Sequence, residues 1–253
     1  IMNILIPMAG AGSRFKKEGY KTSKPLILVN QKPMVVEATS HLPKGEKYIY
    51  ICRVNNIAND HIDKEIKKYY SDAQFIVINE LTEGQAATCL LAKDEINNNE
   101  ELIIGACDNG MIWNEKKFLF EKNEADCLVW SFRNNVTVVN KPEAYGWVEV
   151  NEEKFAKRAS VKVPISKNPI SDHAIVGTFW FKKGKYFVEA AEKMIAKNRR
   201  INNEFYVDEC INELIETGLK VKVFEVDKYI CWGTPNDLRT YEYWQGFHKS
   251  QNF

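Results

Sequence analysis

A glycine loop near the start of the chain carries the clearest chemical signal. The loop consists of Met8, Ala9, Gly10, Ala11, Gly12, Ser13 and Arg14. Glycine lacks a Cβ, so the backbone N–H groups of such a loop can come close to phosphate oxygens. From residue 14 to residue 24 there are five basic side chains and one acid, Glu18; the basic ones are Arg14, Lys16, Lys17, Lys21 and Lys24. This local excess of positive charge predicts a polyphosphate site.

Two familiar phosphate motifs do not fit this loop. A dinucleotide fingerprint needs a third glycine where the chain has Phe15, and it needs an acid at the end of the second strand, which ends at Arg53. The Gly-x-x-x-x-Gly-Lys spacing of a P-loop is also missing here. We therefore expect a nucleotide-phosphate site of another kind.

Two further side chains are candidates for ligand contacts. Asp108 follows the apolar run at residues 101–106, and open α/β sheets bind ligands at the carboxyl ends of their strands. The alternative is that Asp108 only caps a turn or a helix. Gln85 has an amide that can both donate and accept hydrogen bonds, although it could also serve only in a capping box with Thr82.

The elements that must position these residues follow from hydrophobic periodicity. Strands are predicted at residues 3–8, 47–53, 74–78, 101–106 and 125–132, and helices at residues 34–41, 60–70, 85–92 and 114–123. This alternation predicts an α/β fold with a Rossmann-like, mostly parallel sheet and helical crossovers. Thr234 with Asp237 predicts a second capping box, at the start of the last helix.

The pattern changes in the second half of the chain. Residues 145–150 and the stretch up to residue 163 favour extended structure, as do residues 178–181, whereas residues 206–217 favour a helix. We expect an antiparallel excursion that forms a wall for a second substrate, here called the acceptor. The last aromatic residues have helical spacing and are expected to pack on the core; they are Trp232, Tyr241, Tyr243, Trp244 and Phe247.

Composition limits the class of protein. The chain has 253 residues, 45% of them hydrophobic, which favours a single domain over 2–253 with halves at about 2–132 and 133–253. A net charge of +1 gives no global attraction to nucleic acid. No signal peptide or membrane helix is evident, so we expect a cytoplasmic protein without a membrane partner. The cysteine and histidine spacings predict no metal or redox motif, and the oligomeric state stays open.

Several motifs in a fixed order resemble those of the NTP-transferase family, which includes sugar-phosphate nucleotidyltransferases and cytidylyltransferases. The resemblance covers nearly the whole chain. It rests on Gly10-Ala11-Gly12-Ser13-Arg14, Lys24-Pro25, Glu83-Gly84-Gln85-Ala86-Ala87, Cys107-Asp108-Asn109, Ala144-Tyr145-Gly146, Asn203-Glu204-Phe205-Tyr206-Val207 and Trp232-Gly233-Thr234-Pro235.

The resemblance implies a role for each candidate. The glycine loop would wrap the phosphates of an NTP, with Arg14 and Lys24 meeting the charge on the α-phosphate and the pyrophosphate. Asp108 would hold Mg²⁺, and Gln85 would read the base. The acceptor would be a small phosphorylated metabolite bound by Gly146, Lys162, Asn203 and Glu204. Its phosphate can attack the α-phosphorus itself, so no nucleophilic side chain is needed.

Three positions depart from the family pattern. Sugar-specific members carry Glu and Asn where this chain has Val161 and Ile175, and many relatives carry a metal-binding Asp where it has Cys231. An apolar wall would leave sugar hydroxyls without partners. We therefore expect a phosphorylated amine or amino acid, first of all phosphoglutamine with CTP, as in the modification of capsular polysaccharide. No second metal ligand is predicted.

Other interpretations keep or change the class of protein. A sugar-1-phosphate or phosphocholine nucleotidyltransferase would differ only in its acceptor. A GT-A glycosyltransferase would need a DxD motif, and Asp108-Asn109-Gly110 lacks the second acid. An inactive nucleotide-binding regulator is disfavoured because Arg14, Lys24 and Asp108 are all present.

Overall fold

A central sheet of nine strands organises the chain in the computed structural model, which describes residues 1–251. Its strands are β1 (Met2–Pro7), β4 (Lys47–Arg53), β5 (Gln74–Ile78), β6 (Glu101–Ile104), β8 (Cys127–Phe132), β9 (Gly146–Val150), β10 (Ala156–Val161), β11 (His173–Phe181) and β12 (Val221–Glu225). Two small sheets pair β2 (Leu28–Val29) with β3 (Lys32–Pro33) and β7 (Asn109–Ile112) with β13 (Lys228–Cys231).

Helices connect these strands. The α-helices are α1 (Ser13–Lys17), α2 (Met34–Ser40), α3 (Val54–Ala58), α4 (Ile62–Lys67), α5 (Gln85–Leu90), α6 (Lys93–Ile96), α7 (Glu115–Glu121), α8 (Thr137–Asn140), α9 (Gly184–Ala196), α10 (Val207–Glu216) and α11 (Pro235–Gln251). Three short 3₁₀ helices lie at Lys24–Leu26, Pro142–Ala144 and Pro169–Ser171.

The sheet is mostly parallel in its first half. β6, β1, β4 and β5 run side by side in parallel, and β12 is parallel to β8. β11 is antiparallel to β6, β8 and β9, and β10 is antiparallel to β9. The predicted α/β class with helical crossovers and an antiparallel excursion is therefore confirmed. The division into two halves is still a prediction.

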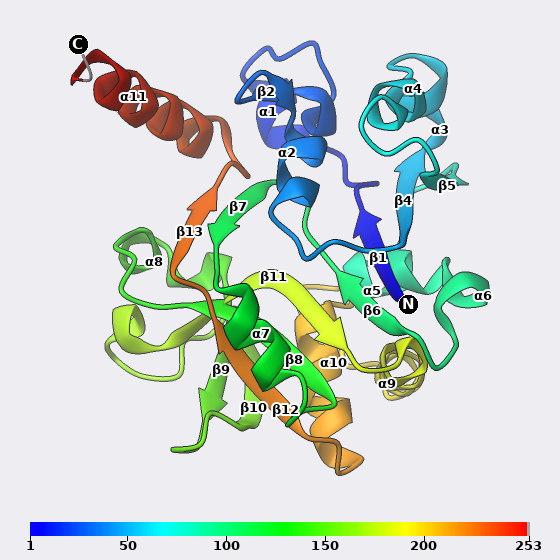
Figure 1. The fold of residues 1–253 in the computed structure, drawn as a ribbon, viewed down its shortest axis with the longest axis vertical. Coiled ribbons are helices and arrows are strands. Elements are labelled where there is room, and N and C mark those ends of the chain that lie inside the picture. Colours follow the sequence, from blue (N-terminus) through cyan, green and yellow to red (C-terminus); the bar gives the residue numbers. More distant parts are fainter. Residues whose placement is uncertain (252–253) are drawn as a thin grey trace.

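Helices cover both faces of the sheet (Figure 1). Leu5 packs in a core with residues of α5, α9 and α10, whereas Ile4 and Ile6 pack in a second core with residues of α2, α4 and α7. Successive strand side chains point to opposite faces, so a strand covered on both sides needs a continuous apolar run. This explains the hydrophobic run Ile4-Leu5-Ile6 in β1.

Two predictions about helix starts have different outcomes. Thr234 and Asp237 form the predicted capping box, because the Thr234 N–H donates to the Asp237 carboxylate and the Asp237 N–H donates to the Thr234 hydroxyl. The capping box at Thr82 is wrong. Helix α5 begins after Gly84, and the Thr82 hydroxyl donates to the Gly84 carbonyl instead.

The prediction for the terminal aromatics is wrong in part. Trp232 is buried and contacts Tyr241, but Tyr243, Trp244 and Phe247 are 68%, 52% and 42% exposed. Their exposure follows from the placement of α11, which extends away from the body of the molecule (Figure 1).

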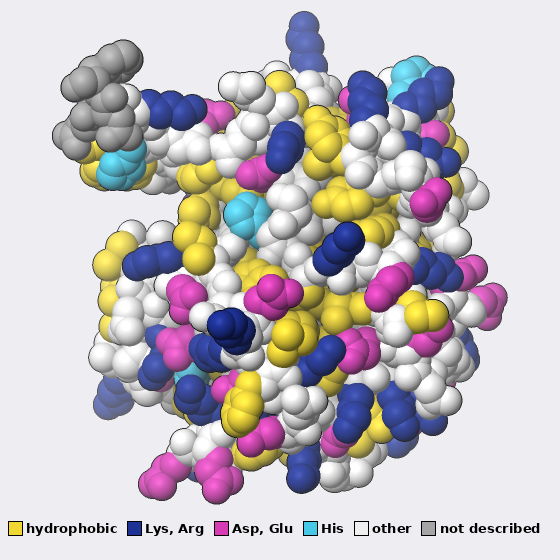
Figure 2. Space-filling view, in the orientation of Figure 1, with side chains coloured by type: hydrophobic (Ala, Val, Ile, Leu, Met, Phe, Trp, Pro, Cys, Tyr) yellow, Lys and Arg dark blue, Asp and Glu magenta, His cyan; other side chains and the backbone are white. Residues whose placement is uncertain are grey.

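The surface carries charges of both signs. On the face drawn in Figure 2, basic and acidic side chains are interspersed, as the net charge of +1 suggests. Within residues 1–251, no helix is both long enough and apolar enough to cross a membrane.

Candidate active site

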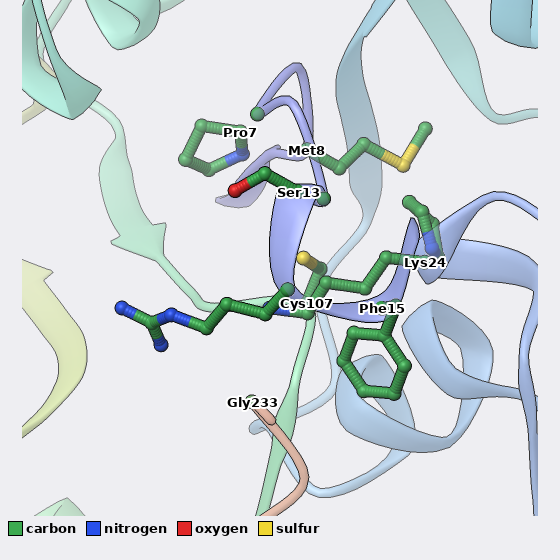
Figure 3. Close-up of a pocket in the computed structure, with 11 residues that line it drawn as sticks. Pro7, Met8, Ser13, Phe15, Lys24, Cys107 and Gly233 are labelled. Atoms are coloured by element: carbon green, nitrogen blue, oxygen red, sulfur yellow. The ribbon is translucent and has the colours of Figure 1, made fainter. Parts of the chain in front are cut away.

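A pocket of about 320 Å³ lies where three segments meet (Figure 3). The three segments that contribute most are the glycine loop after β1, the 3₁₀ helix Lys24–Leu26 and the loop after β6, and Gly233 adds a contact from the loop after β13. The lining residues are Pro7, Met8, Gly10, Gly12, Ser13, Arg14, Phe15, Lys24, Pro25, Cys107 and Gly233. The volume is in the range of small-ligand sites. Most of the residues predicted to contact NTP phosphates therefore border one cavity.

Lys24 and Asp108 form an ion pair at this pocket. The Lys24 Nζ lies 2.5 Å from the Asp108 Oδ2, and the two side chains are 20% and 28% exposed. Burial by itself lowers the pKa of the Lys24 ammonium, but the Asp108 carboxylate outweighs burial and the pKa is raised. Lys24 thus carries a fixed positive charge at the pocket, and Asp108 holds it in place.

Arg14 is the other basic residue that lines the pocket, and its side chain is exposed. Lys16, Lys17 and Lys21 are exposed and do not border the cavity. The only acid of this segment, Glu18, pairs with Arg239 of α11 at 2.6 Å. The charge that faces the pocket is therefore positive.

The surroundings of Asp108 fit a magnesium ion that is coordinated mainly by the phosphates of the bound nucleotide. Among residues 1–251, no three His, Cys, Asp or Glu side chains come together in a way that could hold a metal ion. Mg²⁺ is often bound by one or two carboxylates together with substrate phosphates and water. A partly exposed carboxylate that pairs with a lining residue of the pocket suits that arrangement.

Cys231 does not provide a second ligand for Mg²⁺. Burial raises the pKa of the Cys231 thiol to about 12, with Asp108 and Asp237 adding to the rise, so the thiol stays protonated. Its sulfur accepts a hydrogen bond from the Gly233 N–H at 3.3 Å. Asp237, close by, is committed to the cap of α11, where it accepts from the backbone and hydroxyl of Thr234.

The segment predicted to read the base contacts the loop before α10. The Phe205 N–H donates to the Glu83 carbonyl at 2.7 Å, and the Ala86 N–H donates to the Phe205 carbonyl at 2.9 Å. Gly84 has φ +123°, and a Cβ there would lie 2.5 Å from the Phe205 nitrogen. This close approach explains the glycine and joins the segment that carries Gln85 to the loop that carries Asn203 and Glu204.

The side chains predicted to contact the base and the acceptor in these two segments are accessible. Asn203 and Glu204 are exposed, Asn203 in a left-handed turn with φ +65°, and Gln85 is partly buried. None of them borders the phosphate pocket. Their roles with base and acceptor stay predictions.

Gly146 and Lys162 lie together on the antiparallel side of the sheet. Gly146 pairs with Val161 across β9 and β10, and Lys162 follows directly with φ +68°. The Lys162 Nζ lies 5.3 Å from the centre of the Tyr206 ring. Two of the predicted acceptor residues are therefore adjacent, beside the loop that carries the other two.

Sequence reasoning missed Asp208 in this group. A Cβ on Gly146 would lie 1.9 Å from the Asp208 Oδ2, so the carboxylate occupies the space that the glycine leaves. Gly146 and Asp208 are 62 positions apart in the sequence, so only the folded structure shows that they are in contact. An acid in the first turn of a predicted helix gave no separate signal.

Strand β11 connects the acceptor group to Asp108. Ile175 contacts the position of a Cβ on Gly146 at 3.0 Å. The carbonyl of the next residue, Val176, accepts a hydrogen bond from the Asn109 side chain at 3.0 Å. Asn109 is buried and directly follows Asp108, so both groups belong to one side of the sheet.

The environment of Asp208 predicts a pH-dependent effect on stability. Burial raises the pKa of this carboxyl from 3.8 to about 6, with Glu209 adding to the rise and Lys162 opposing it. Between about pH 4 and 6 the unfolded chain has already released this proton while the folded chain retains it, so the folded state loses stability as pH rises. Asp208→Asn should therefore match the wild type near pH 4 and exceed it above pH 6 by about 3 kcal/mol. Urea unfolding at pH 4 and pH 7 measures the difference, and an equal difference at both values would contradict it.

The fold and the pocket together define an α/β protein with a basic, phosphate-sized site at the carboxyl ends of parallel strands. A family model described as nucleotidyl transferase matches residues 4–245. The chain belongs to this family and is a nucleotidyltransferase. The interpretations as a GT-A glycosyltransferase or an inactive regulator are thereby set aside. A comparison with curated proteins finds no significant match.

Solved structures share this fold at low sequence identity. The nucleoside-diphosphate-sugar pyrophosphorylase of Vibrio cholerae RC9 is 20% identical with a TM-score of 0.75, covering 94% of this chain and 98% of its own. A putative glucose-1-phosphate thymidylyltransferase of Bacillus anthracis is 18% identical with a TM-score of 0.72, covering 95% and 93%. The inositol-1-phosphate CTP transferase of T. maritima is 15% identical, also at 0.72, with the same coverage.

Proposed function

We propose that this nucleotidyltransferase moves CMP from CTP onto the phosphate of a phosphorylated amine or amino acid, with phosphoglutamine as first choice, in the modification of capsular polysaccharide. The observation that carries the choice of acceptor is the apolar wall beside Gly146 and Lys162. Val161 and Ile175, which replace the polar residues of sugar-specific relatives, are only 6% and 5% exposed. A sugar would lose water from its hydroxyls there without gaining these partners.

The choice of CTP has separate support. The sequence resembles cytidylyltransferases of the family, and one structural neighbour is a CTP transferase. At 15% identity that neighbour shares the fold alone. The nucleotide is therefore a matter for direct test.

The chemistry requires positioning and charge neutralisation. An oxygen of the acceptor phosphate, which is largely dianionic at neutral pH, attacks the α-phosphorus of CTP. A new P–O bond forms as the bond to the β-phosphate bridging oxygen breaks, and pyrophosphate leaves with the electron pair. Arg14 and Lys24 stabilise the charge on the transferring and departing phosphates. Mg²⁺, held at Asp108 and by substrate phosphates, would supply further neutralisation.

The decisive experiment is pyrophosphate release from each of the four common NTPs against a panel of acceptors. The panel contains phosphoglutamine, phosphoethanolamine, phosphocholine, glucose-1-phosphate and inositol-1-phosphate. We expect the highest kcat/KM with CTP and an amine-bearing acceptor. Equal or faster turnover with glucose-1-phosphate would refute the proposed acceptor class and leave the family assignment intact.

A sugar phosphate is the second candidate acceptor because of Asp208. Its carboxylate contacts the position of a Cβ on Gly146 and could accept hydrogen bonds from sugar hydroxyls. It would then replace the glutamate that sugar-specific relatives carry at the position of Val161. The same panel separates these candidates.

Lys162 provides a test of the acceptor side alone. Lys162→Ala should lower kcat/KM for the acceptor by about 10-fold or more, because it removes a charge-assisted contact to the acceptor phosphate. The affinity for CTP should stay within about twofold. Calorimetric titration with CTP and steady-state kinetics with the acceptor measure the two effects separately.

Lys157→Ala is the matched control for this variant, since Lys157 is a 57% exposed lysine on β10, the strand that Lys162 follows. It should leave both quantities unchanged. Equal weakening of CTP and acceptor binding by Lys162→Ala would place Lys162 at the nucleotide rather than the acceptor.

A further inference from the structure

We propose that Asp208 is a specificity-determining residue that binds a positively charged amino group on the acceptor. The inference rests on the proposed function, since it names the group that would select amine-bearing acceptors. It is carried by one arrangement at the start of β9 and the end of β10. The carboxylate of Asp208 fills the space beside Gly146, and Lys162 directly follows Val161, which pairs with Gly146.

The first argument is charge balance. Lys162 is the cation whose charge acts on Asp208, yet the two form no ion pair within 4.0 Å in the described chain. If Lys162 binds the acceptor phosphate, its charge is taken up by that phosphate. Asp208 is then a partly buried carboxylate without a charged partner, which is unfavourable. An ammonium group on the acceptor would restore the balance, whereas a neutral hydroxyl would not.

The second argument is that neighbouring acids are already occupied or lie in water. Glu209 lies 3.9 Å from Arg199, and Glu213 lies 3.1 Å from the same guanidinium. Glu204 is exposed on its loop. Asp208 is thus the acid of this region that faces Gly146 and keeps its carboxylate available.

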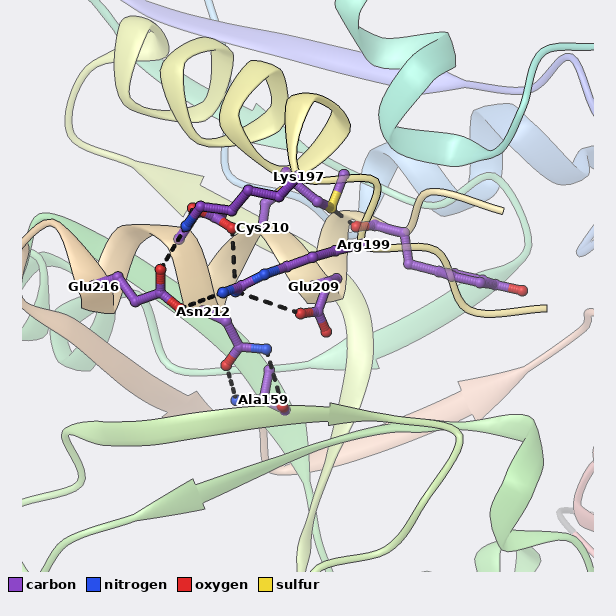
Figure 4. A network of polar contacts seen from close by, with 10 residues as sticks. Ala159, Lys197, Arg199, Glu209, Cys210, Asn212 and Glu216 are labelled. Carbon is purple, nitrogen blue, oxygen red and sulfur yellow. Dashed lines mark hydrogen bonds and ion pairs between the residues drawn. The ribbon is translucent and has the colours of Figure 1, made fainter. Parts of the chain in front are cut away.

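The third argument is that the carboxylate is held in a defined position. Helix α10 is anchored to β10 by Asn212, whose side chain accepts from the Ala159 N–H at 2.9 Å and donates to the Ala159 carbonyl at 3.1 Å (Figure 4). Asp208 and Asn212 are four residues apart and share a helix face. The anchor therefore fixes Asp208 relative to Lys162, which follows β10.

The other side of α10 is fixed as well. Arg199 and Lys197, which follow α9, both pair with Glu216, at 2.6 and 2.7 Å (Figure 4). Since both faces of α10 are tied to neighbouring elements, its first turn presents Asp208 on a rigid support. Such preorganisation favours selection among ligands.

The test compares matched acceptors that differ in one group. Phosphoglutamine is paired with its analogue lacking the α-amino group, and phosphoethanolamine with 2-hydroxyethyl phosphate. The wild type should prefer the amino-bearing member of at least one pair by about 30-fold in kcat/KM, as expected for a desolvated charge pair. Asp208→Asn keeps the shape of the side chain and should remove most of this preference, with the analogue lacking the amino group scarcely affected.

Two controls separate the role in specificity from a structural role. Glu209→Gln alters the adjacent acid and should keep the wild-type preference. The affinity of Asp208→Asn for CTP should equal that of the wild type, which also shows that the variant is folded.

Each outcome decides between the proposals. If the wild type uses amine-bearing acceptors and Asp208→Asn keeps the same preference, the role of Asp208 is overturned while the proposed function stands. If Asp208→Asn lowers kcat/KM equally for both members of a pair, Asp208 supports the fold or the binding of the acceptor phosphate, and the inference is likewise wrong. If the wild type rejects every amine-bearing acceptor and uses glucose-1-phosphate, the proposed function and the inference both fall.

Discussion

Asp108→Ala is expected to abolish pyrophosphate release that depends on a divalent ion, with a loss of about 10³-fold in kcat. Asp108 is a partly exposed carboxylate that pairs with Lys24, a lining residue of the pocket. With no three potential ligands gathered within residues 1–251, most of the coordination of Mg²⁺ falls to the substrate, so a single carboxylate carries a large share of the protein's contribution. Loss of preorganised charge at reacting phosphates has an effect of this order.

The measurement is pyrophosphate release over a Mg²⁺ titration. Asp227→Ala is a suitable control because Asp227 is an exposed acid between β12 and β13. The alanine variant also leaves Lys24 without its partner, so Asp108→Asn should be measured beside it, because the amide oxygen can still accept from the Lys24 ammonium. Both variants should need much more Mg²⁺. More than a tenth of wild-type turnover at saturating Mg²⁺ would refute the metal role.

The first half of the fold could be predicted because its signals are local. β1 and β6 each contain a run of three apolar residues that is buried between two helical layers. The glycine loop follows β1 at the predicted place and borders the pocket. Asp108, predicted from its position after an apolar run, lies at that same pocket through its contact with Lys24. In each case the residue types and their order along the chain carry the information.

What could not be predicted depends on contacts between distant segments. The Lys24–Asp108 pair joins residues 84 positions apart, and the contact of Asp208 with Gly146 also requires the folded sheet. The sequence singles out Lys24, Asp108 and Gly146, but it does not show which residue each of them contacts. Gly146 is predicted to bind the acceptor, and the space beside it holds the Asp208 carboxylate.

Two errors have a common physical cause. Thr82 was assigned to a capping box from spacing alone, but its hydroxyl bonds the Gly84 carbonyl because the chain turns there to meet Phe205. The aromatic spacing of α11 was taken to indicate packing, although Tyr243 and Trp244 face solvent. Periodicity shows which residues share a helix face, and only tertiary contacts decide whether that face is covered.

Lys24→Ala is expected to lower kcat by about 10²-fold with a smaller effect on KM for CTP. The Lys24 ammonium is held at the pocket by Asp108, which also raises its pKa against the effect of burial, so it stays charged at any pH used for assays. An ion at Asp108 would compete with Lys24 for the carboxylate. The released ammonium can then turn to the phosphates, where charge grows during transfer. Arg14→Ala should have an effect of similar size, because Arg14 is the other basic residue that lines the pocket.

The kinetic pattern decides this role. Lys21→Ala is the matched control, since Lys21 is exposed, lies in the same basic segment and does not border the pocket. It should have wild-type kinetics. Lys24→Arg should recover part of the rate if charge is what matters, and less if the compact shape of the ammonium is also needed. A rise in KM with kcat unchanged in Lys24→Ala would mean that Lys24 binds CTP equally in the ground and transition states. Lys24 would then bind the nucleotide without accelerating the transfer.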